Sequence, residues 1–319
     1  MTNSQAIIAL SQQARSYLLS CDKAITDELI DSNLLRWQVK QRQRKTSAYL
    51  FEMMLRHAVN TEIKNHPLGI WLPLTDTSQT NEETNASNVY LRHLLASVLF
   101  NFDPHKVVET FKGDHKKVLQ HILQQYLHIL SDPPKWNKKT CQAWKKYAQT
   151  ICSAAAFLVD DQQYKTFKSL LSHANIKDVD TLLPPVQLLK KNIKGMNFAL
   201  ACDFIKELGY RDYVMPDRYL IETCLATSLI DIKQIRKAAH KTKILHKPPK
   251  KKNAKRSYDA SNISTSKFFK AIVTLCRDNG IIPYEFDKLI WLVVSGLFIQ
   301  PDDKVVKYPV RHHPFKPMA

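Results

Sequence analysis

Long apolar segments are missing from this sequence. The longest strongly apolar run, Leu289–Ile299, is too short to cross a bilayer. The first residues, MTNSQAIIALSQQARSYLLSC, lack the basic region and long apolar core of a secretory signal. We therefore expect a protein that makes no membrane contact through a spanning segment and is located in the cytoplasm.

Paired cysteines are also missing. The six cysteines are widely scattered and form no CxxC pair: Cys21, Cys141, Cys152, Cys202, Cys224 and Cys276. This pattern favours reduced thiols in a cytoplasm over a zinc site or a disulfide framework. The twelve histidines include His121, His128 and the pair His312–His313, but no set has the spacing of metal ligands. We expect no metal site.

Acidic residues are in the minority. The chain has 47 Lys and Arg against 29 Asp and Glu, a formal net charge of +18. Such a surplus attracts polyanions, so nucleic acid is the leading partner, and a solvated basic surface or anionic lipid is the alternative. Two stretches, Arg36–Lys45 and Lys135–Lys146, mix aromatic and cationic residues as DNA backbone contacts do. Each stretch on its own is more typical of a solvated helix face.

Strand patterns are nearly absent, whereas apolar residues recur at helical spacing. Val118, Ile122, Tyr126 and Ile129, for example, fall on one face of a helix. The sequence therefore predicts an all-α protein. Four regions are expected: an N-terminal helical region with a polar loop at 75–87 (1–175), a central motif (176–230), a flexible basic loop (231–260) and a C-terminal helical region that packs with the N-terminal part (261–319).

The basic loop follows from charge and proline. Between Ile232 and Tyr258 there are eleven Lys or Arg and no Asp or Glu, and a Pro-Pro pair lies within the run. Like charges and prolines both oppose a helix through its second half. The loop could follow nucleic-acid phosphates, or it could be a solvated insertion.

Glycine is scarce, with six in 319 residues, yet Gly195 stands in a short break between two apolar runs. Val186–Ile193 and Phe198–Leu208 read as helices on either side of it. A connection this short needs residues that tolerate positive φ, and we assign that role to Gly195 and Asn197. Met196 is expected to lie beneath the turn as an apolar plug.

Such a turn can bind an anion. The first amides of the second helix have no partner within that helix and point outward at the positive end of its dipole. Lys194, Lys190 and Lys191 would add positive charge beside them. An ordinary αα-corner, in which the glycine serves only the chain path, is an equal alternative.

A carboxylate follows the second helix at a defined place. Gly209 suits the C′ position of that helix, and the loop YRDYVMP comes next. Asp217 then follows Pro216 and precedes a clear helical pattern, so it occupies an N-cap position. Pro184, near the start of the first helix, marks its N-terminal turn.

This order of features resembles the helix-hairpin-helix DNA glycosylase superfamily over residues 184–229. The family has a hairpin, a Gly/Pro-rich loop and then a catalytic Asp. Here Asn197 replaces the second Gly of the usual Gly-x-Gly, and Pro216 and Asp217 are adjacent where the family usually has a residue between them. The resemblance implies a two-lobed helical fold that holds double-stranded DNA across a cleft, in a monomeric protein.

The resemblance also implies roles for individual residues. Asp217 would be catalytic, and Ala199 stands where the family's Schiff-base members carry a Lys, which implies a monofunctional enzyme that uses water. No cofactor is implied beyond a possible alkali cation on the hairpin carbonyls. DNA contacts would come from Lys190, Lys191, Lys194, Gly195, Met196, Asn197 and Phe198. Candidate base-pocket residues are Tyr213, Tyr219, Trp71 and Trp291.

The reaction expected from the resemblance is hydrolysis of an N-glycosidic bond. A base is flipped from the duplex, and an ionised carboxylate stabilises the positive charge that develops on the sugar. The base could be alkylated, oxidised or deaminated, as in DNA repair, or a hypermodified cytosine of viral DNA, as in antiviral defence. Two alternatives remain: a non-catalytic DNA-binding protein in which Asp217 only caps its helix, and an RNA-binding scaffold that uses the basic loop near Lys250.

Overall fold

A computed structural model gives the fold of residues 3–42, 45–58, 95–129, 138–236, 263–301 and 304–310. These residues are mostly helical, so the all-α prediction is confirmed at the level of fold class. The strands within these ranges are a short antiparallel pair, β1 (Leu297–Ile299) and β2 (Val305–Lys307). None of the helices in the same ranges combines the length and the apolarity needed to span a bilayer.

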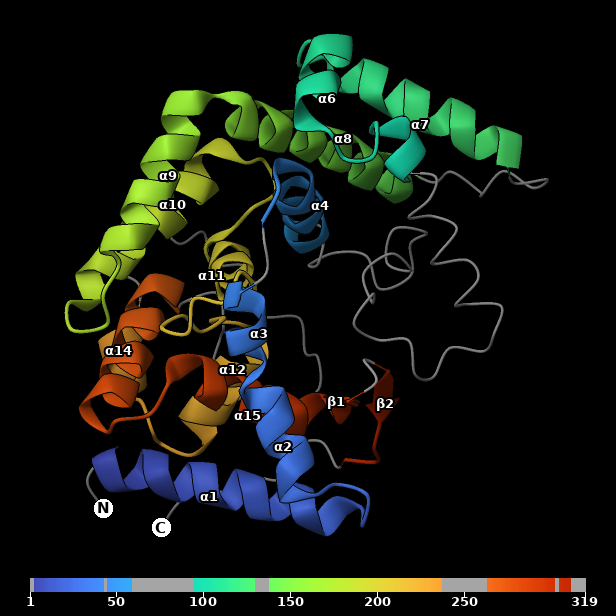
Figure 1. The fold of residues 1–319 in the computed structure, drawn as a ribbon. Helices are drawn as coiled ribbons and strands as arrows, with labels where there is room; N and C mark the ends of the chain where they lie inside the picture. Colours follow the sequence, from blue (N-terminus) through green and yellow to red (C-terminus); the bar gives the residue numbers. More distant parts are fainter. Residues whose placement is uncertain are drawn as a thin grey trace, which may run out of the picture.

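The helices fall into two groups along the molecule (Figure 1). The group drawn at the top contains α4 (Ser47–Ala58), α6 (Pro104–Phe111), α7 (His115–Ile129), α8 (Lys138–Val159), α9 (Asp161–His173) and α10 (Leu183–Asn192). The group at the bottom contains α1 (Asn3–Cys21), α2 (Asp27–Leu34), α12 (Arg218–Ala226), α13 (Ile232–Ile235), α14 (Thr265–Asp278), α15 (Pro283–Ser295) and the β1–β2 pair. Segments from both ends of the chain meet in this lower group, because α1 packs against α14 and α15.

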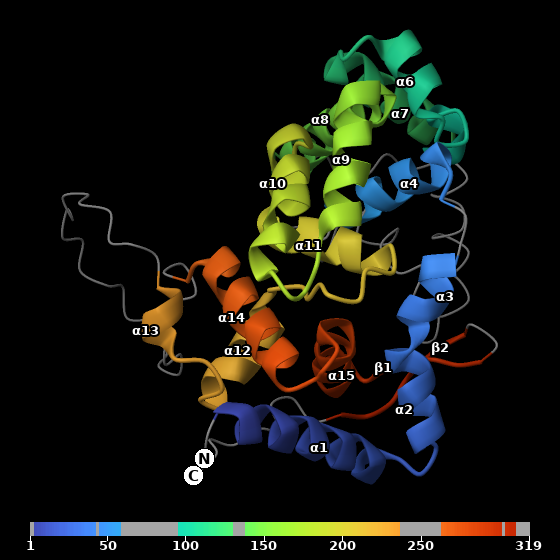
Figure 2. The same ribbon diagram turned by 60° about the vertical axis from the view of Figure 1, so that its left-hand side comes forward.

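One helix, α11 (Phe198–Glu207), lies between the two groups (Figure 2). It packs against α10 and α4 on one side, and against α14 and α3 (Arg36–Arg42) on the other. Nearly all of its residues are buried, including Asp203 and Lys206. The chain just after its C-terminal end lies tight against α3, since a Cβ added at Gly209 would come within 2.8 Å of the Gln41 Cα. The φ of Gly209 is +95°, a conformation that glycine adopts readily. Gly209 therefore has the C′ role that the sequence predicts.

Most helix starts follow from local capping chemistry. Asp103 accepts hydrogen bonds from the amides of His105 and Lys106 at the start of α6, and Asp160 and Ser264 cap α9 and α14 in the same manner. Asp178 caps a 3-10 turn (Val179–Leu182) that leads into α10, and Pro184 lies in the first turn of α10, as the sequence predicts.

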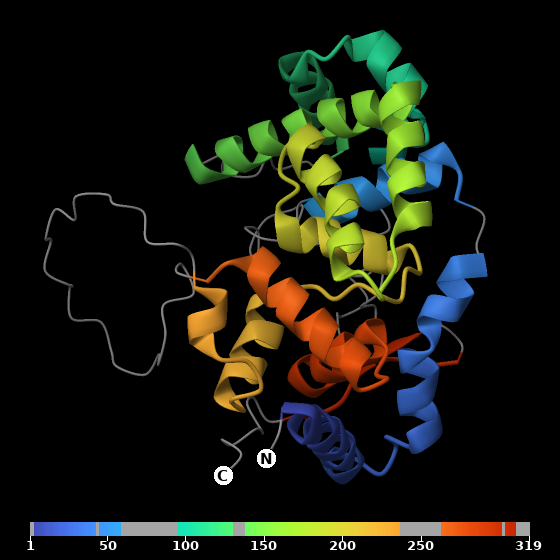
Figure 3. The same ribbon diagram turned by 90° about the vertical axis from the view of Figure 1, so that its left-hand side faces the viewer.

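Several predicted features lie outside the described residues. These are the polar loop at 75–87, Trp71 and most of the basic segment beyond Arg236. The first part of that segment forms the short helix α13, which Figure 3 shows beside α12 and α14. Arg236 then forms an isolated β-bridge with Ile263, so the chain returns beside its point of departure.

Candidate functional site

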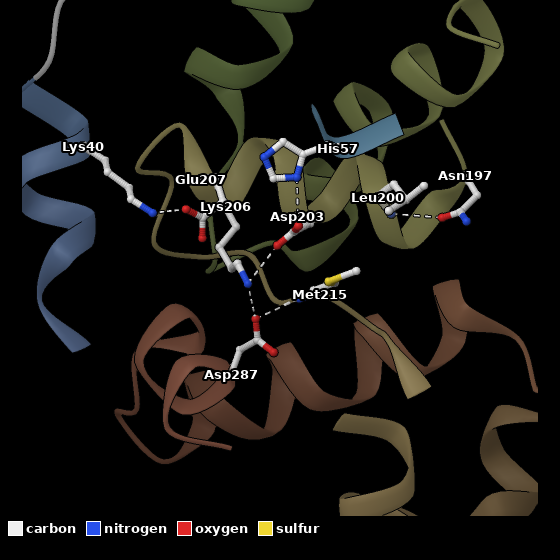
Figure 4. Close-up of polar contacts among 9 residues, drawn as sticks. All are labelled: Lys40, His57, Asn197, Leu200, Asp203, Lys206, Glu207, Met215 and Asp287. Atoms are coloured by element: carbon white, nitrogen blue, oxygen red, sulfur yellow. Dashed lines mark hydrogen bonds and ion pairs between the residues drawn. The ribbon is translucent and has the colours of Figure 1, made fainter. Parts of the chain in front are cut away.

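The turn between α10 and α11 has the predicted hairpin form. Gly195 has a φ of +84°, and Met196 is buried beneath the turn and donates its amide to the Ile193 carbonyl at 3.2 Å. The positive φ predicted for Asn197 is wrong, because its φ is −84°. Asn197 is instead the N-cap of α11, and its side chain accepts a hydrogen bond from the Leu200 amide at 3.0 Å (Figure 4). Its role comes from the side-chain oxygen rather than from backbone freedom.

Helix α8 supports the turn from behind. The Thr150 hydroxyl donates to the Lys194 carbonyl at 2.7 Å, and the Lys194 amide donates to the Ser153 hydroxyl at 2.9 Å. The side chains of Lys190, Lys191 and Lys194 are exposed around the turn. The buried side chains of Met196 and Phe198 leave only their backbone groups for a ligand.

The amides at the start of α11 bear on which kind of ion the turn could bind. Within the described part of the chain, the amides of Phe198 and Ala199 at the start of α11 donate no hydrogen bond. The Lys194 carbonyl, one of those that could hold an alkali cation, already accepts the Thr150 hydroxyl. The geometry of the turn is therefore better suited to an anion than to a cation.

Replacing Gly195 by alanine is expected to destabilise the fold more than the same change at Gly113. Both have positive φ, which costs an L-residue roughly 1–2 kcal/mol. A Cβ at Gly195 would also lie 2.8 Å from the Thr150 Oγ1, whereas nothing lies within 4 Å of one at Gly113. The extra cost at Gly195 should be about 1–3 kcal/mol. Urea unfolding of both variants measures this difference, and equal losses would show that α8 does not constrain the turn.

Asp217 is the N-cap of α12, as the sequence predicts. Its Oδ1 accepts a hydrogen bond from the Leu220 amide at 2.8 Å. Its Oδ2 accepts no hydrogen bond from the described residues, and the side chain keeps partial exposure to solvent. A tight turn precedes it, since the Asp217 amide donates to the Met215 carbonyl at 2.6 Å. One carboxylate oxygen is thus used for the fold and the other is left available.

The charge state expected for Asp217 needs correction. Placement at a helix N-terminus favours the ionised form, and the Leu220 amide does lower the pKa of Asp217. Desolvation by burial is the larger effect, however, and it raises the pKa of Asp217 to about 7. The charge of Asp287 adds to this rise, and the charge of Lys206 opposes it. At neutral pH the carboxyl group is therefore close to half ionised.

A buried cluster of charged side chains, not predicted from the sequence, acts electrostatically on Asp217. Its centre is Lys206, whose Nζ is 3.0 Å from the Asp203 Oδ1 and 2.6 Å from the Asp287 Oδ2 (Figure 4). The His57 Nδ1 lies 2.8 Å from the Asp203 Oδ2, and the Met215 amide donates to the Asp287 Oδ2 at 3.2 Å. The cluster therefore links α4, α11, α15 and the loop before Asp217.

Mutual attraction keeps the centre of this cluster ionised. Burial opposes the charge of each group, but Asp287 and Asp203 outweigh it at Lys206 and raise the pKa of that lysine. Likewise, Lys206 and His57 hold the pKa of Asp203 below its ordinary value. At Asp287 the effect of burial is stronger, and the pKa of that carboxyl group is raised. Lys206 is thus a fixed cation between two carboxyl groups.

The sequence did contain one signal for this cluster. Asp203 and Lys206 stand three residues apart: Asp203 lies within the otherwise apolar stretch FALACDFI, and Lys206 follows it directly, in the helix that the fold buries. Charged residues at buried helix positions are almost always paired. Their partners could not be identified in advance, because His57 and Asp287 lie 146 and 81 residues away in the chain.

Comparison of the chain with protein-family models, with curated proteins and with solved structures found no match in any of the three. The functional interpretation therefore depends on the geometry of the site. Within the described ranges, no group of three or more His, Cys, Asp or Glu side chains is arranged to hold a metal ion.

The four candidate base-pocket residues differ in their surroundings. Tyr213 is a core residue: it is 1% exposed, and its hydroxyl donates to the Leu182 carbonyl at 3.1 Å. It offers no free stacking face, so its assignment to a pocket is corrected. Tyr219, two residues beyond Asp217, is 42% exposed. Trp291 is partly buried, with the Lys288 Nζ 3.8 Å from its ring centroid. Trp71 lies outside the described residues.

Proposed function

We propose that this protein is a monofunctional DNA N-glycosylase that hydrolyses the N-glycosidic bond of a damaged or modified base, with Asp217 as the catalytic carboxylate. The observation that carries the proposal is the arrangement of Asp217 itself. One oxygen is fixed by the Leu220 amide, the other is free, and the side chain keeps access to solvent. It also follows a helix-hairpin-helix turn with exposed lysines.

The hairpin supports DNA as the partner. The free amides of Phe198 and Ala199 and the exposed side chains of Lys190, Lys191 and Lys194 lie at one turn, where a backbone phosphate can accept from the amides. The two groups of helices correspond, on this proposal, to the two lobes of a helix-hairpin-helix glycosylase, with DNA held across them. The net charge of +18 supplies attraction to the duplex.

The chemistry requires an ionised carboxylate beneath the sugar. As the base departs, positive charge develops on the deoxyribose, and the free oxygen of Asp217 stabilises it and orients the attacking water. The Asp287 carboxylate holds the Met215 amide, and so fixes the loop that carries Asp217. Asp287 is thus a positioning residue in this proposal, and Lys206 fixes Asp287 in turn.

A lyase mechanism through a Schiff base has no support. Position 199 is alanine, which has no nucleophile. Lys206 is buried, and both neighbouring aspartates keep it protonated. A protonated amine cannot attack the sugar carbon, so hydrolysis by water is the reaction that fits.

A screen of duplexes tests the proposal. End-labelled duplexes that each carry one alkylated, oxidised, deaminated or hypermodified base are incubated with the protein and then treated with hot alkali, which cleaves at abasic sites. We expect alkali-dependent cleavage with one class of base. Borohydride added during the reaction should trap no covalent protein–DNA complex. A trapped complex would contradict the monofunctional mechanism. If no duplex is cleaved, glycosylase activity on the tested classes of base is contradicted.

A non-catalytic helix-hairpin-helix DNA-binding protein is the second candidate. It is favoured by the hydrogen bond that makes Asp217 a helix cap and by the raised pKa, which leaves the side chain partly uncharged. This candidate predicts duplex binding that weakens with salt, without cleavage of any duplex. Binding to structured RNA in preference to duplex DNA would instead favour the RNA-binding scaffold.

A further inference from the structure

Two helices joined by a short turn lie at the end of the upper group that is farthest from α1 (Figures 1 and 2). Helix α6 ends at Phe111, the turn is Lys112–Asp114, and α7 begins at His115. Both helices pack against α8, and they also contact each other. Two helices joined by a turn of three or four residues that contains glycine are typical of a helix-turn-helix motif.

Backbone conformation and capping fix the turn. Lys112 has a φ of +48° and Gly113 a φ of +76°, so two successive residues are left-handed and the chain changes direction sharply. Asp114 then caps α7, since its Oδ1 accepts from the amides of Lys116 at 2.9 Å and Lys117 at 3.4 Å. A Cβ added at Gly113 would meet nothing within 4 Å, so the outer side of the turn is open.

Helix α7 has one buried face and one polar face. Val118 and Ile122 are fully buried in the core. The exposed side chains on the described part of the helix are Lys116, Lys117, Gln120 and Gln124. At 3.6 residues per turn these four lie together on one side of the helix, opposite the buried pair. We call them the polar face of α7.

The polar face of α7 differs from an ordinary solvated helix surface in its charge. Helix α7 contains no Asp or Glu, whereas exposed helices commonly mix acidic and basic side chains that pair at i, i+4. Of the two acidic residues nearby, Asp114 is used as the cap and Glu109 lies on α6. Lys106 and Lys112, both exposed, add further positive charge. Such a surface attracts a polyanion.

Glutamine and lysine are side chains that read bases in the major groove of DNA. A glutamine amide can bond to adenine N6 and N7 together, and a lysine ammonium donates to guanine O6 and N7. This groove admits an α-helix, whereas the major groove of duplex RNA is deep and narrow. In a helix-turn-helix motif the second helix enters the groove, and its N-terminal residues contact base edges. The polar face begins in the first turn of α7, which matches this geometry.

We propose that α6 and α7 form a helix-turn-helix motif that binds the major groove of duplex DNA, with the polar face of α7 toward the base edges. The inference rests on the DNA partner of the proposed function but not on catalysis at Asp217. Helix α8 supports both turns, since its Thr150 and Ser153 hold the hairpin turn. The motif gives the protein a preference for base sequence, which phosphate contacts at the hairpin cannot supply.

Selection from a library of random duplexes with the full chain tests the proposal without any need for base excision. One base sequence should be enriched, and wild type should bind it about tenfold or more tightly than a scrambled duplex. The double variant Gln120→Ala with Gln124→Ala should lose most of this preference. Gln12→Ala with Gln13→Ala is the matched control, because both glutamines are exposed on α1 and alanine suits a helix. Failure to enrich any sequence, or a preference that the α7 variant retains, would overturn the proposal.

Modified duplexes identify the groove. In the enriched sequence, 7-deazaadenine replaces adenine, which removes the N7 acceptor from the major groove and leaves base pairing and the minor groove unchanged. Binding by wild type should weaken several-fold. Unchanged binding, or equal affinity for an RNA duplex of the same sequence, would overturn the assignment to the major groove of DNA.

These outcomes are distinguishable from those of the base-excision screen. If a sequence is enriched through α7 and no base is excised, the helix-turn-helix motif stands and the glycosylase proposal fails. If bases are excised without any preference for the surrounding sequence, the glycosylase proposal stands and the role of α7 is overturned.

Discussion

Replacing Asp217 by asparagine is expected to slow base excision about a thousandfold and to leave the fold intact. Asparagine caps a helix nearly as well as aspartate, so the hydrogen bond to the Leu220 amide is retained. The negative charge is lost, and at ~4 Å in a medium of effective dielectric about 20 such a charge contributes about 4 kcal/mol. This corresponds to roughly three orders of magnitude in rate.

Single-turnover kinetics on the duplex found in the screen measures this effect. Duplex binding by the variant should match that of wild type, because the hairpin is unchanged. If Asp217→Asn excises the base at a rate close to wild type, Asp217 is only a helix cap and the catalytic group lies elsewhere. If the variant unfolds at a lower urea concentration, part of the loss in rate belongs to the fold.

The pH dependence provides a separate test of the same residue. The ionised form is the active one, so the rate of base excision should rise with pH and level off above about 7, where burial places the pKa of Asp217.

The stability of the fold should change with pH in the opposite direction. The folded state binds this proton more tightly than the unfolded state, so the contribution of Asp217 to stability decreases as pH rises from the ordinary aspartate range to about 7. Wild type should lose stability relative to Asp217→Asn over this interval, as measured by urea unfolding at several pH values.

Replacing Lys206 by methionine is expected to destabilise the protein by about 3–5 kcal/mol, the usual cost of removing one partner from a buried ion pair. The change leaves Asp203 and Asp287 buried without the cation that lies 3.0 and 2.6 Å from them. Lys165→Met serves as the control, because Lys165 and Asp161 form an exposed ion pair on α9, and such a pair contributes at most about 1 kcal/mol. The free energy of unfolding in urea measures both.

A second substitution separates the loss of charge from the loss of packing. In the double variant Lys206→Met with Asp287→Asn, one of the two carboxylates that lost their cation is made neutral, and part of the lost stability should return. If Lys206→Met alone changes stability no more than Lys165→Met does, the cluster does not hold the helices together in solution, and the positioning role of Asp287 has no basis.

Local features of this protein were predictable from its sequence. The turn at Gly195, the C′ role of Gly209 and the cap at Asp217 each depend on residues within a few positions of one another. Their conformations are decided by backbone sterics and by short-range hydrogen bonds, which the order of residues specifies directly.

Features that depend on tertiary packing were not predictable in the same manner. The local context of Asp217 favours ionisation, but the burial that raises its pKa depends on elements distant in sequence. Tyr213 has the sequence context of a surface loop, yet its ring packs near Phe269 of α14, with 5.9 Å between the ring centroids. A single sequence shows that Asp203 and Lys206 need partners, but not that α4 and α15 provide them.

The position of α11 limits how the protein can move. Buried charged side chains of this helix contact His57 in α4 on one side and Asp287 in α15 on the other. Separating the upper helices from the lower ones would expose or break these contacts, which is costly for charges in a poorly hydrated interior. The two halves should therefore behave as a rigid body. On the proposed function, a bound duplex would then have to adapt to the protein rather than induce the protein to close around it.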